Sequence, residues 1–172
     1  MASSATALSV SEYLETTYRP DCELIDGELL ERNVGEYDHA NLQGALIALL
    51  RARQRDWNIR ALPEQRLQVS ASRFRIPDVC VVSRNQPIEP VFTRPPLVCV
   101  EVLSPRDTLA NLQDRVDDYL RFGVRSIWVL DPVRRRGWIC AAGSMTEPPD
   151  RILAVPGTLI AIQLDELFAD LD

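Results

Sequence analysis

The sequence predicts an α/β fold with a mixed central sheet flanked by helices. Three consecutive segments indicate it: an apolar run at residues 97–103, an amphipathic helical pattern at 107–122 and a second apolar run at 126–130. Apolar runs rich in β-branched residues are typical of strands buried on both faces. A strand, a helix and a strand in this order form a crossover unit with parallel strands. Hairpin signals elsewhere add antiparallel strands, so the predicted sheet is mixed.

The N-terminal part is predicted to hold a short helix and a hairpin. Residues 1–7 are expected to fray as a terminus. Ser9 followed by Glu12 has the spacing of a capping box, which predicts a helix over 10–17. The Asp26-Gly27 pair within CELIDGELLER predicts a tight turn between two short strands.

Residues 37–55 are predicted to form a helix with Asp38 as its N-cap. Apolar side chains at helical spacing should face the core, and these are Leu42, Ala45, Leu46 and Leu49. Residues 58–69 and 73–82 follow as two predicted strands joined by a short polar turn. VFTRPP, residues 91–96, should be a loop.

The helix over 107–122 should turn Leu109, Leu112, Val116 and Tyr119 inward and end at Gly123. The strand at 126–130 should end at Asp131-Pro132. Residues 136–141 can pair back on it as a hairpin, and LDELF near the C-terminus predicts a short helix.

Composition places the chain among ordinary globular proteins of one domain. It has 172 residues, a net charge of −6 and 19 basic residues, all of them arginine. The negative charge argues against strong non-specific binding to DNA, which depends on phosphate neutralisation. No segment has the apolar length of a membrane helix or the pattern of a signal peptide, so a cytoplasmic protein without membrane contact is expected.

The cysteines are expected to be free and reduced. They are far apart, without CxxC spacing, so zinc and disulfides are both disfavoured. Those within apolar runs should behave as small hydrophobes. The four positions are Cys22, Cys80, Cys99 and Cys140.

The most informative feature is a carboxylate in each of two apolar strands. Alternation places Asp78 on one face with Phe74, Ile76, Cys80 and Val82, and Glu101 on one face with Leu97, Cys99 and Leu103. Burying two ionised acids side by side is costly without a cation. Two carboxylates suit Mg²⁺, with Mn²⁺ as a substitute. The alternative is that each acid pairs with an arginine or accepts a backbone amide, and such pairing with no room for an ion would argue against a metal site.

Six segments in order resemble a bacterial family of small restriction endonucleases, the Uma-type family of the PD-(D/E)xK nuclease superfamily. The resemblance covers roughly residues 10–168, and the six segments are ELIDGEL, the helix with His39, RIPDVCVV, PPLVCVEVLSP, DYLRFGVRSIWVLDP and VPGTLIAIQLDELF. It implies a restriction-endonuclease-like core and Mg²⁺-dependent hydrolysis of phosphodiester bonds. It also implies metal ligands at Asp78, which follows Pro77, and at Glu101.

The sequence departs from the pattern of that family at the lysine. The superfamily usually has a lysine two residues after the second acid, where this chain has Leu103. The Uma-type family instead has a lysine on the next helix, four residues before a tyrosine; counting back from Tyr119 gives Arg115. An aspartate is common four residues earlier, and this chain has Asn111. Arg115 either stabilises the transferring phosphate by charge or makes a surface salt bridge.

Two further side chains are candidates for the site. His39, the only histidine, should share the inward face of its helix with Leu42 and Leu46. It is either a satisfied buried residue or a group that places water, phosphate or a proton. The resemblance also marks Glu23, either as an additional metal ligand or as a residue that hydrogen-bonds to the ligands and orients them. The alternative is a solvated acid at a strand edge.

The leading hypothesis is a Mg²⁺-dependent endonuclease acting on DNA, with Asp78 and Glu101 as metal ligands. The alternative is a domain of nuclease fold that has lost catalysis and binds DNA or protein as a regulatory module. Hydrolysis of another phosphoester is a weaker third hypothesis. The basic clusters 51–55 and 134–136 either contact DNA or are solvated. A homodimer is compatible with this hypothesis, because many endonucleases cut two strands and oligomers are usually symmetric, but no sequence feature indicates the interface.

Overall fold

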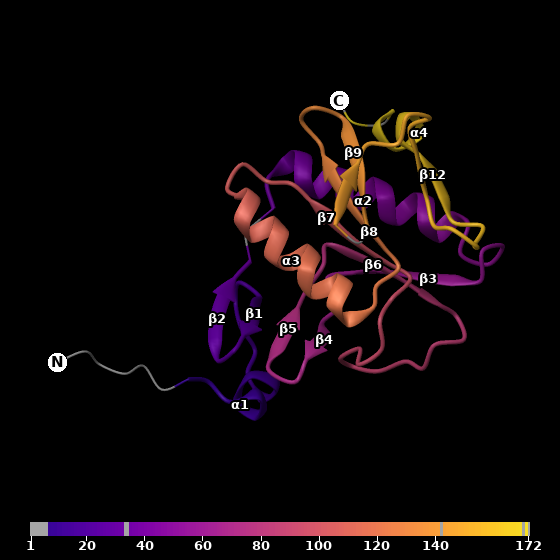
Figure 1. The fold of residues 1–172 in the computed structure, drawn as a ribbon. Helices are drawn as coiled ribbons and strands as arrows, with labels where there is room; N and C mark the ends of the chain where they lie inside the picture. Colours follow the sequence, from indigo (N-terminus) through magenta and orange to yellow (C-terminus); the bar gives the residue numbers. More distant parts are fainter. Residues whose placement is uncertain (1–6, 33–34, 142, 170, 172) are drawn as a thin grey trace.

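The structure is a computed structural model that describes residues 7–32, 35–141, 143–169 and 171 (Figure 1). The terminus expected to fray lies outside these residues except for residue 7. In chain order the elements are α1 (Val10–Glu15), β1 (Cys22–Ile25), β2 (Glu28–Glu31), α2 (Tyr37–Ala52), β3 (Ile59–Pro63), β4 (Leu67–Ser70), β5 (Arg73–Arg75), β6 (Val79–Ser83), β7 (Val98–Val102), α3 (Leu109–Phe122), β8 (Ser126–Asp131), β9 (Arg136–Ala141), β10 (Ser144–Thr146), β11 (Ile152–Ala154), β12 (Ala161–Gln163) and α4 (Leu164–Phe168).

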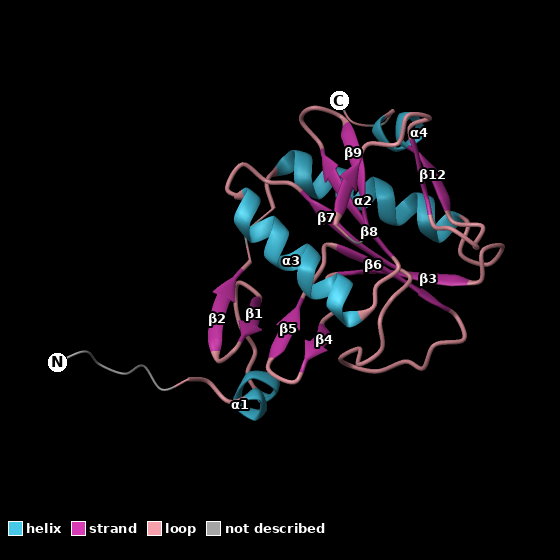
Figure 2. Ribbon diagram, in the orientation of Figure 1, coloured by secondary structure: helices cyan, strands magenta, loops and turns pink. Residues whose placement is uncertain are grey.

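The main sheet has the strand order β10-β9-β8-β7-β6-β3. β7 and β8 are parallel and are joined through α3, whereas the other neighbours in this sheet are antiparallel. The sheet is therefore mixed and flanked by helices, which confirms the predicted fold class (Figure 2).

Helices cover both faces of this sheet, and strand alternation decides which residues face which helix. On β7, Val98, Val100 and Val102 pack in one core cluster with the apolar face of α2 and with α4. Cys99 points the other way, into a second cluster that contains Leu112, Val116 and Tyr119 of α3. Because Glu101 alternates with Val100 and Val102, its side chain is on the α3 face.

A smaller sheet, in the order β2-β1-β5-β4, lies beside α3 (Figure 1). The β1–β2 hairpin turns at Asp26 and Gly27, whose φ values of 52° and 92° are those of a tight turn in the left-handed region. This sheet packs on α1 through Tyr13, Leu24 and Phe74. The predicted hairpin and the capping box of Ser9 and Glu12 are both confirmed.

The prediction of two strands over 58–69 and 73–82 was wrong. Each segment contains two strands that belong to different sheets: β3 and β6 to the main sheet, β4 and β5 to the smaller one. The second break falls at Pro77, which has no N–H for a ladder. Phe74 therefore packs near α1, whereas Cys80 and Val82 pack under α3, and the predicted common face does not exist.

Two helix details also differ from prediction. α2 begins after Glu36, which has extended backbone angles, and Asp38 lies in the first turn, where its charge favours the helix dipole. Leu109 is 77% exposed, because the apolar stripe of α3 starts at Leu112. The stop at Gly123 is confirmed by its φ of 101°.

Among the described residues, no helix has the length and apolar character needed to cross a membrane. Cys80 and Cys99 are buried, as predicted from their apolar runs, and Cys22 and Cys140 are buried as well; all four are free.

Candidate active site

Strand register brings Asp78 and Glu101 together. β6 and β7 are antiparallel, with Cys80 opposite Cys99 and Val79 opposite Val100. One further step places Asp78 opposite Glu101 on the α3 side of the sheet. The Val102 amide donates to Asp78 Oδ2 at 2.7 Å, so this side chain takes the place of a ladder acceptor beyond the end of β6.

Asp78 is 4% exposed and is held from three directions. Besides the Val102 amide, Arg32 Nη2 donates to Asp78 Oδ1 at 2.6 Å. His39 Nε2 lies 3.3 Å from Asp78 Oδ2. Arg32 comes from the residue after β2, and His39 from the first turn of α2, so Asp78 ties both sheets and a helix to one point.

Glu101 is equally buried and is held by α3. Tyr119 Oη donates to Glu101 Oε1 at 2.6 Å, and Arg115 Nε lies 3.0 Å from Glu101 Oε2 without the alignment of a hydrogen bond. Burial raises the pKa of Glu101 to about 7, and the charge of Asp78 acts in the same direction, against Arg115 and Tyr119. The two acids therefore affect each other electrostatically.

Arg115 lies in the site, bridging two carboxylates. Its Nη2 donates to Asp107 Oδ1 at 2.9 Å, while its Nε faces Glu101. Burial lowers its pKa, but the charges of Glu101 and Asp107 outweigh this and raise it further, so the guanidinium stays protonated. The Arg115 side chain is 18% exposed, so its ion pairs with Glu101 and Asp107 are largely buried, and its action on a phosphate stays a prediction.

His39 faces the same site. Burial opposes its charged form, but the hydrogen bond and charge of Asp78 raise the pKa of its imidazole above the usual value. Its Nδ1 is buried and has no hydrogen-bond partner among the residues that the structure describes.

Glu23 lies at the edge of the site and is fully engaged with protein donors. Arg75 Nη1 donates to Glu23 Oε2 at 2.7 Å, and the Ile76 amide donates to Oε1 at 2.8 Å. Arg75 also donates through Nε to Asp118 Oδ2 at 2.8 Å. This buried Glu23–Arg75–Asp118 network joins β1 and β5 of the smaller sheet to α3.

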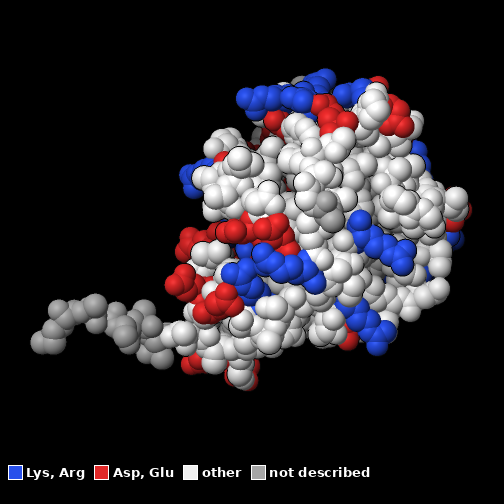
Figure 3. All heavy atoms as spheres, viewed as in Figure 1, with Lys and Arg blue, Asp and Glu red and all other residues white. Residues whose placement is uncertain are grey.

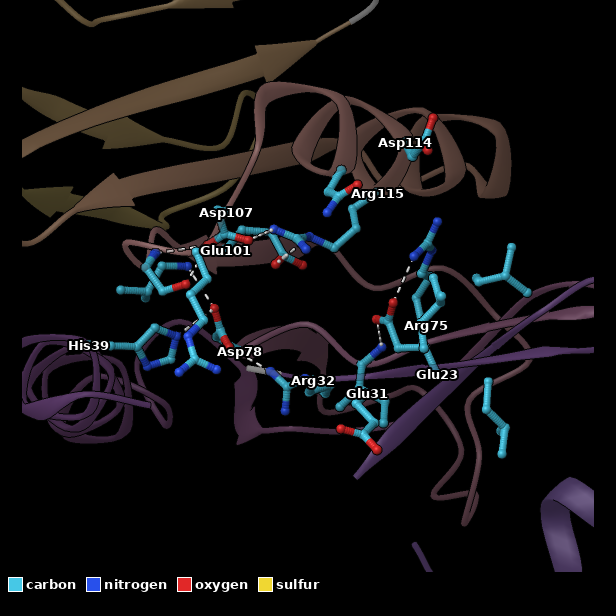
Figure 4. A pocket seen from close by; sticks show the side chains of 18 of the residues that line it. Glu23, Glu31, Arg32, His39, Arg75, Asp78, Glu101, Asp107, Asp114 and Arg115 are labelled. Atoms are coloured by element: carbon cyan, nitrogen blue, oxygen red, sulfur yellow. Dashed lines mark hydrogen bonds and ion pairs between the residues drawn. The ribbon is translucent and has the colours of Figure 1, made fainter. Parts of the chain in front are cut away.

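These side chains surround one cavity of about 330 Å³ (Figure 4). Its lining includes every site residue predicted from the sequence, namely Glu23, His39, Asp78, Glu101 and Arg115. Figure 4 shows His39 and Asp78 on one side of the cavity, Glu23 and Arg75 on the other, and Arg115 above them. Asn111, at the position where the resemblance in the sequence leads us to expect an aspartate, also lines it.

The donor set has the chemistry for a hard divalent cation that keeps water and phosphate oxygens among its ligands. Mg²⁺ is commonly held by one or two carboxylates, and the cavity far exceeds the ~30 Å³ that one water takes up in the liquid. Asp78 and Glu101 each face an arginine, as in the alternative in which each acid pairs with its own arginine. The cavity, however, leaves space beside the two carboxylates. Within the described part of the chain, no three or more His, Cys, Asp or Glu side chains form a metal-binding group, so an all-protein cage does not fit.

Sequence reasoning missed several residues of the site. Arg32, Asp107 and Arg75 lie in the cavity lining, and the phenol of Tyr119 contacts Glu101 directly. Tyr119 carried a signal as the tyrosine at family spacing from Arg115, yet apolar periodicity assigned it to the core. Arg32 has no local signal, because its partner Asp78 is 46 residues away in the chain.

The two basic clusters do not line this cavity. Arg53 pairs with Glu166 at 2.7 Å, and Arg134 with Asp131 at 3.2 Å. Figure 3 shows acidic and basic side chains side by side where α3 passes the smaller sheet, consistent with the ion pairs at the cavity. Contact of these clusters with DNA stays a prediction.

Comparisons with known proteins agree with the fold and with the resemblance seen in the sequence. Residues 10–164 match the family model described as "Uma2: Putative restriction endonuclease". The chain also resembles a crystal structure described as "a putative nuclease belonging to DUF820 from Anabaena variabilis ATCC 29413", at 19% identity and a TM-score of 0.79. The alignment covers 94% of this chain and 98% of that chain. No curated protein gives a significant match.

Proposed function

We propose that this chain, which belongs to the Uma2 family of restriction endonucleases, is a Mg²⁺-dependent endonuclease that hydrolyses phosphodiester bonds of DNA. The observation that carries the proposal is the pair of buried acids, Asp78 and Glu101, on neighbouring antiparallel strands beside one polar cavity. Burying two ionised carboxylates side by side costs free energy. The cavity gives both side chains access to a cation and to substrate.

In this mechanism Asp78 and Glu101 would hold the metal ion. A hard divalent cation, Mg²⁺ or Mn²⁺ as its substitute, would supply Lewis acidity toward a phosphodiester and a water of lowered pKa. Arg115, always charged, offsets the negative charge that develops on the phosphate. It cannot take over a step that needs a lysine to lose its proton.

His39 is the candidate for placing water or moving a proton. Its Nε2 faces Asp78, and its Nδ1 is without a partner among the described residues, so the ring has capacity for one more hydrogen bond. Glu23, predicted as an additional metal ligand, has both oxygens on protein donors. Asp78 and Glu101 also meet protein donors, so position separates the three acids: Glu23 lies across the cavity from Asp78 and anchors Arg75, and we propose Asp78 and Glu101 as the ligands.

The test is cleavage of supercoiled plasmid and branched DNA with Mg²⁺ or Mn²⁺. Asp78→Asn and Glu101→Gln keep side-chain shape but remove the charges, and each should abolish cleavage. Glu147→Gln is the matched control, because it removes an acid from an arginine pair outside the cavity. Thermal melts verify folding. Cleavage by folded Asp78→Asn at the wild-type rate would exclude the mechanism.

A second candidate function is a DNA- or protein-binding module without catalysis. It is favoured by one observation: arginines neutralise both acids, Arg32 at Asp78 and Arg115 at Glu101. Calorimetric titration with Mn²⁺ separates the candidates. Heat of binding that disappears in Asp78→Asn supports the nuclease, whereas DNA binding with no metal binding supports the module.

DNA as the partner and a homodimeric assembly are parts of the proposal. The arginines of the cavity suit phosphate oxygens, which they bind as planar forks. A two-fold symmetric dimer would present two such cavities to the two strands of a duplex. Sedimentation equilibrium with and without duplex DNA gives the assembly directly.

A further inference from the structure

We infer that Arg32 and Arg115 are exchangeable counter-ions, which couple the binding of the divalent cation to the binding of substrate phosphate. The inference rests on the proposed function and adds to it how the site is loaded. Both arginines approach the cavity from outside the main sheet, Arg32 from the end of β2 and Arg115 from α3.

Each arginine is shared between one acid of the metal pair and one acid outside it. Arg32 contacts Asp78 at 2.6 Å and Glu64 at 3.3 Å. Arg115 faces Glu101 at 3.0 Å and Asp107 at 2.9 Å, and only the Asp107 contact is an aligned hydrogen bond. An arginine that leaves the metal pair therefore keeps a carboxylate partner, which lowers the cost of the exchange.

The charges explain why the cation and phosphate should bind together. Asp78 and Glu101 are balanced by Arg32 and Arg115, all four side chains being at most 18% exposed. A divalent cation added alone brings two positive charges beside two buried guanidinium groups, which disfavours its binding. Phosphate added alone would have to compete with the carboxylates that already pair with both arginines, which disfavours its binding. When both arrive, the cation takes the carboxylates and the arginine forks take the phosphate oxygens.

Other charged groups at the site do not remove this competition. His39 lies 3.3 Å from Asp78 and brings no negative charge to the site. Glu23 is balanced by Arg75. The exchange at Arg32 and Arg115 is therefore the route by which the site makes room for a cation.

Replacing Arg32 and replacing its second partner, Glu64, should change the Mn²⁺ affinity in opposite directions. Arg32→Gln removes the competing charge, so Mn²⁺ without DNA should bind at least about fivefold more tightly, the low end of typical coupling. Glu64→Gln removes the alternative partner, and its side chain is 50% exposed, so the fold should tolerate it. Arg32 then stays on Asp78, and Mn²⁺ should bind more weakly. Arg53→Gln, outside the cavity, is the control.

The reciprocal measurement is DNA affinity, by fluorescence anisotropy of a phosphorothioate duplex, which keeps its charge and resists hydrolysis. Mn²⁺ should strengthen duplex binding by wild type roughly tenfold, because coupling between two sites is reciprocal. Arg32→Gln should reduce this gain. Calorimetry measures Mn²⁺ binding alone, and thermal melts verify that each variant is folded.

The outcomes separate this inference from the proposed function. Equal Mn²⁺ affinity in wild type, Arg32→Gln and Glu64→Gln would overturn the exchange and leave the metal-dependent nuclease standing. A wild-type protein and an Arg32→Gln variant that both fail to bind Mn²⁺ would overturn both. Opposite shifts in the two variants, with the control unchanged, support the exchange.

Discussion

Arg75 should be among the most destabilising arginines to replace. Its guanidinium spans Glu23 and Asp118, and the three side chains are 5%, 8% and 2% exposed. Arg75→Met keeps most of the side-chain volume but leaves both acids without their shared cation. Removing one partner of a buried ion pair typically costs ~3–5 kcal/mol, because the remaining charge stays buried.

The contacts that remain place the expected loss at the lower end of that range. Glu23 keeps the Ile76 amide, and Asp118 keeps Arg73 at 2.7 Å. We therefore expect the free energy of unfolding to fall by about 3 kcal/mol. For a domain of this size such a loss lowers the melting temperature by roughly 6–12 °C.

Urea denaturation of two variants tests the reasoning. Arg121→Met also removes an arginine from Asp118, but the Arg121 side chain is 68% exposed. Its loss should change the free energy of unfolding by ~0–1 kcal/mol, the range of surface pairs. Equal midpoints and slopes for Arg75→Met and Arg121→Met would refute the argument that burial of the Glu23–Arg75–Asp118 network sets its importance.

Three further predictions concern the helices, the cysteines and the cavity. Gly123→Ala should destabilise by ~1–2 kcal/mol in denaturant titrations, because φ is 101°, whereas Gly44→Ala in α2 should stabilise by ~0.5–1 kcal/mol, since an added Cβ meets nothing within 4 Å; shifts of the same sign would contradict this. Burial raises the pKa of Cys80 to about 12 and of Cys140 to about 11, so iodoacetamide at pH 8 should label neither until the protein unfolds, as read by mass spectrometry. Burial opposes ionisation of Asp107, but Arg115 and Ser104 lower its pKa below 3.8, so the stability that its ionised form contributes is present at neutral pH and is lost as the pH falls through the lowered value. The stability deficit of Asp107→Asn should therefore shrink in melts below about pH 4. A constant deficit would exclude the ion pair as its cause.

The main sheet was predictable because its signals are local. The run at 97–103 is buried on both faces in β7, and Gly123 ends α3 as its position suggests. The break near Pro77 was not recognised, because the alternating residue pattern of a strand continues across it in the sequence. Only tertiary structure reveals that β5 and β6 belong to different sheets.

The two acids were predictable for a physical reason: ionisable groups in apolar strands are expensive, so their presence marks a site. Their partners were not predictable in the same way. Arg32 and Asp78 meet through a contact between segments far apart in the chain, and Glu64 joins them from the end of β3. Nothing in the local pattern around Arg32 distinguishes it from a solvated arginine.

The absence of lysine has a structural counterpart in the cavity. Four of its arginines each contact two carboxylates: Arg32 with Asp78 and Glu64, Arg73 with Asp26 and Asp118, Arg75 with Glu23 and Asp118, and Arg115 with Glu101 and Asp107. A planar guanidinium presents donors in several directions, whereas an ammonium is a compact point charge. We therefore expect a lysine at position 115 to contact Glu101 and Asp107 at the same time less well than arginine does. Arginine stands at position 115, where the resemblance in the sequence leads us to expect a lysine, and it contacts two acids but cannot lose its proton. In the proposed function, proton transfer therefore falls to another group, and His39, 3.3 Å from Asp78, is our candidate.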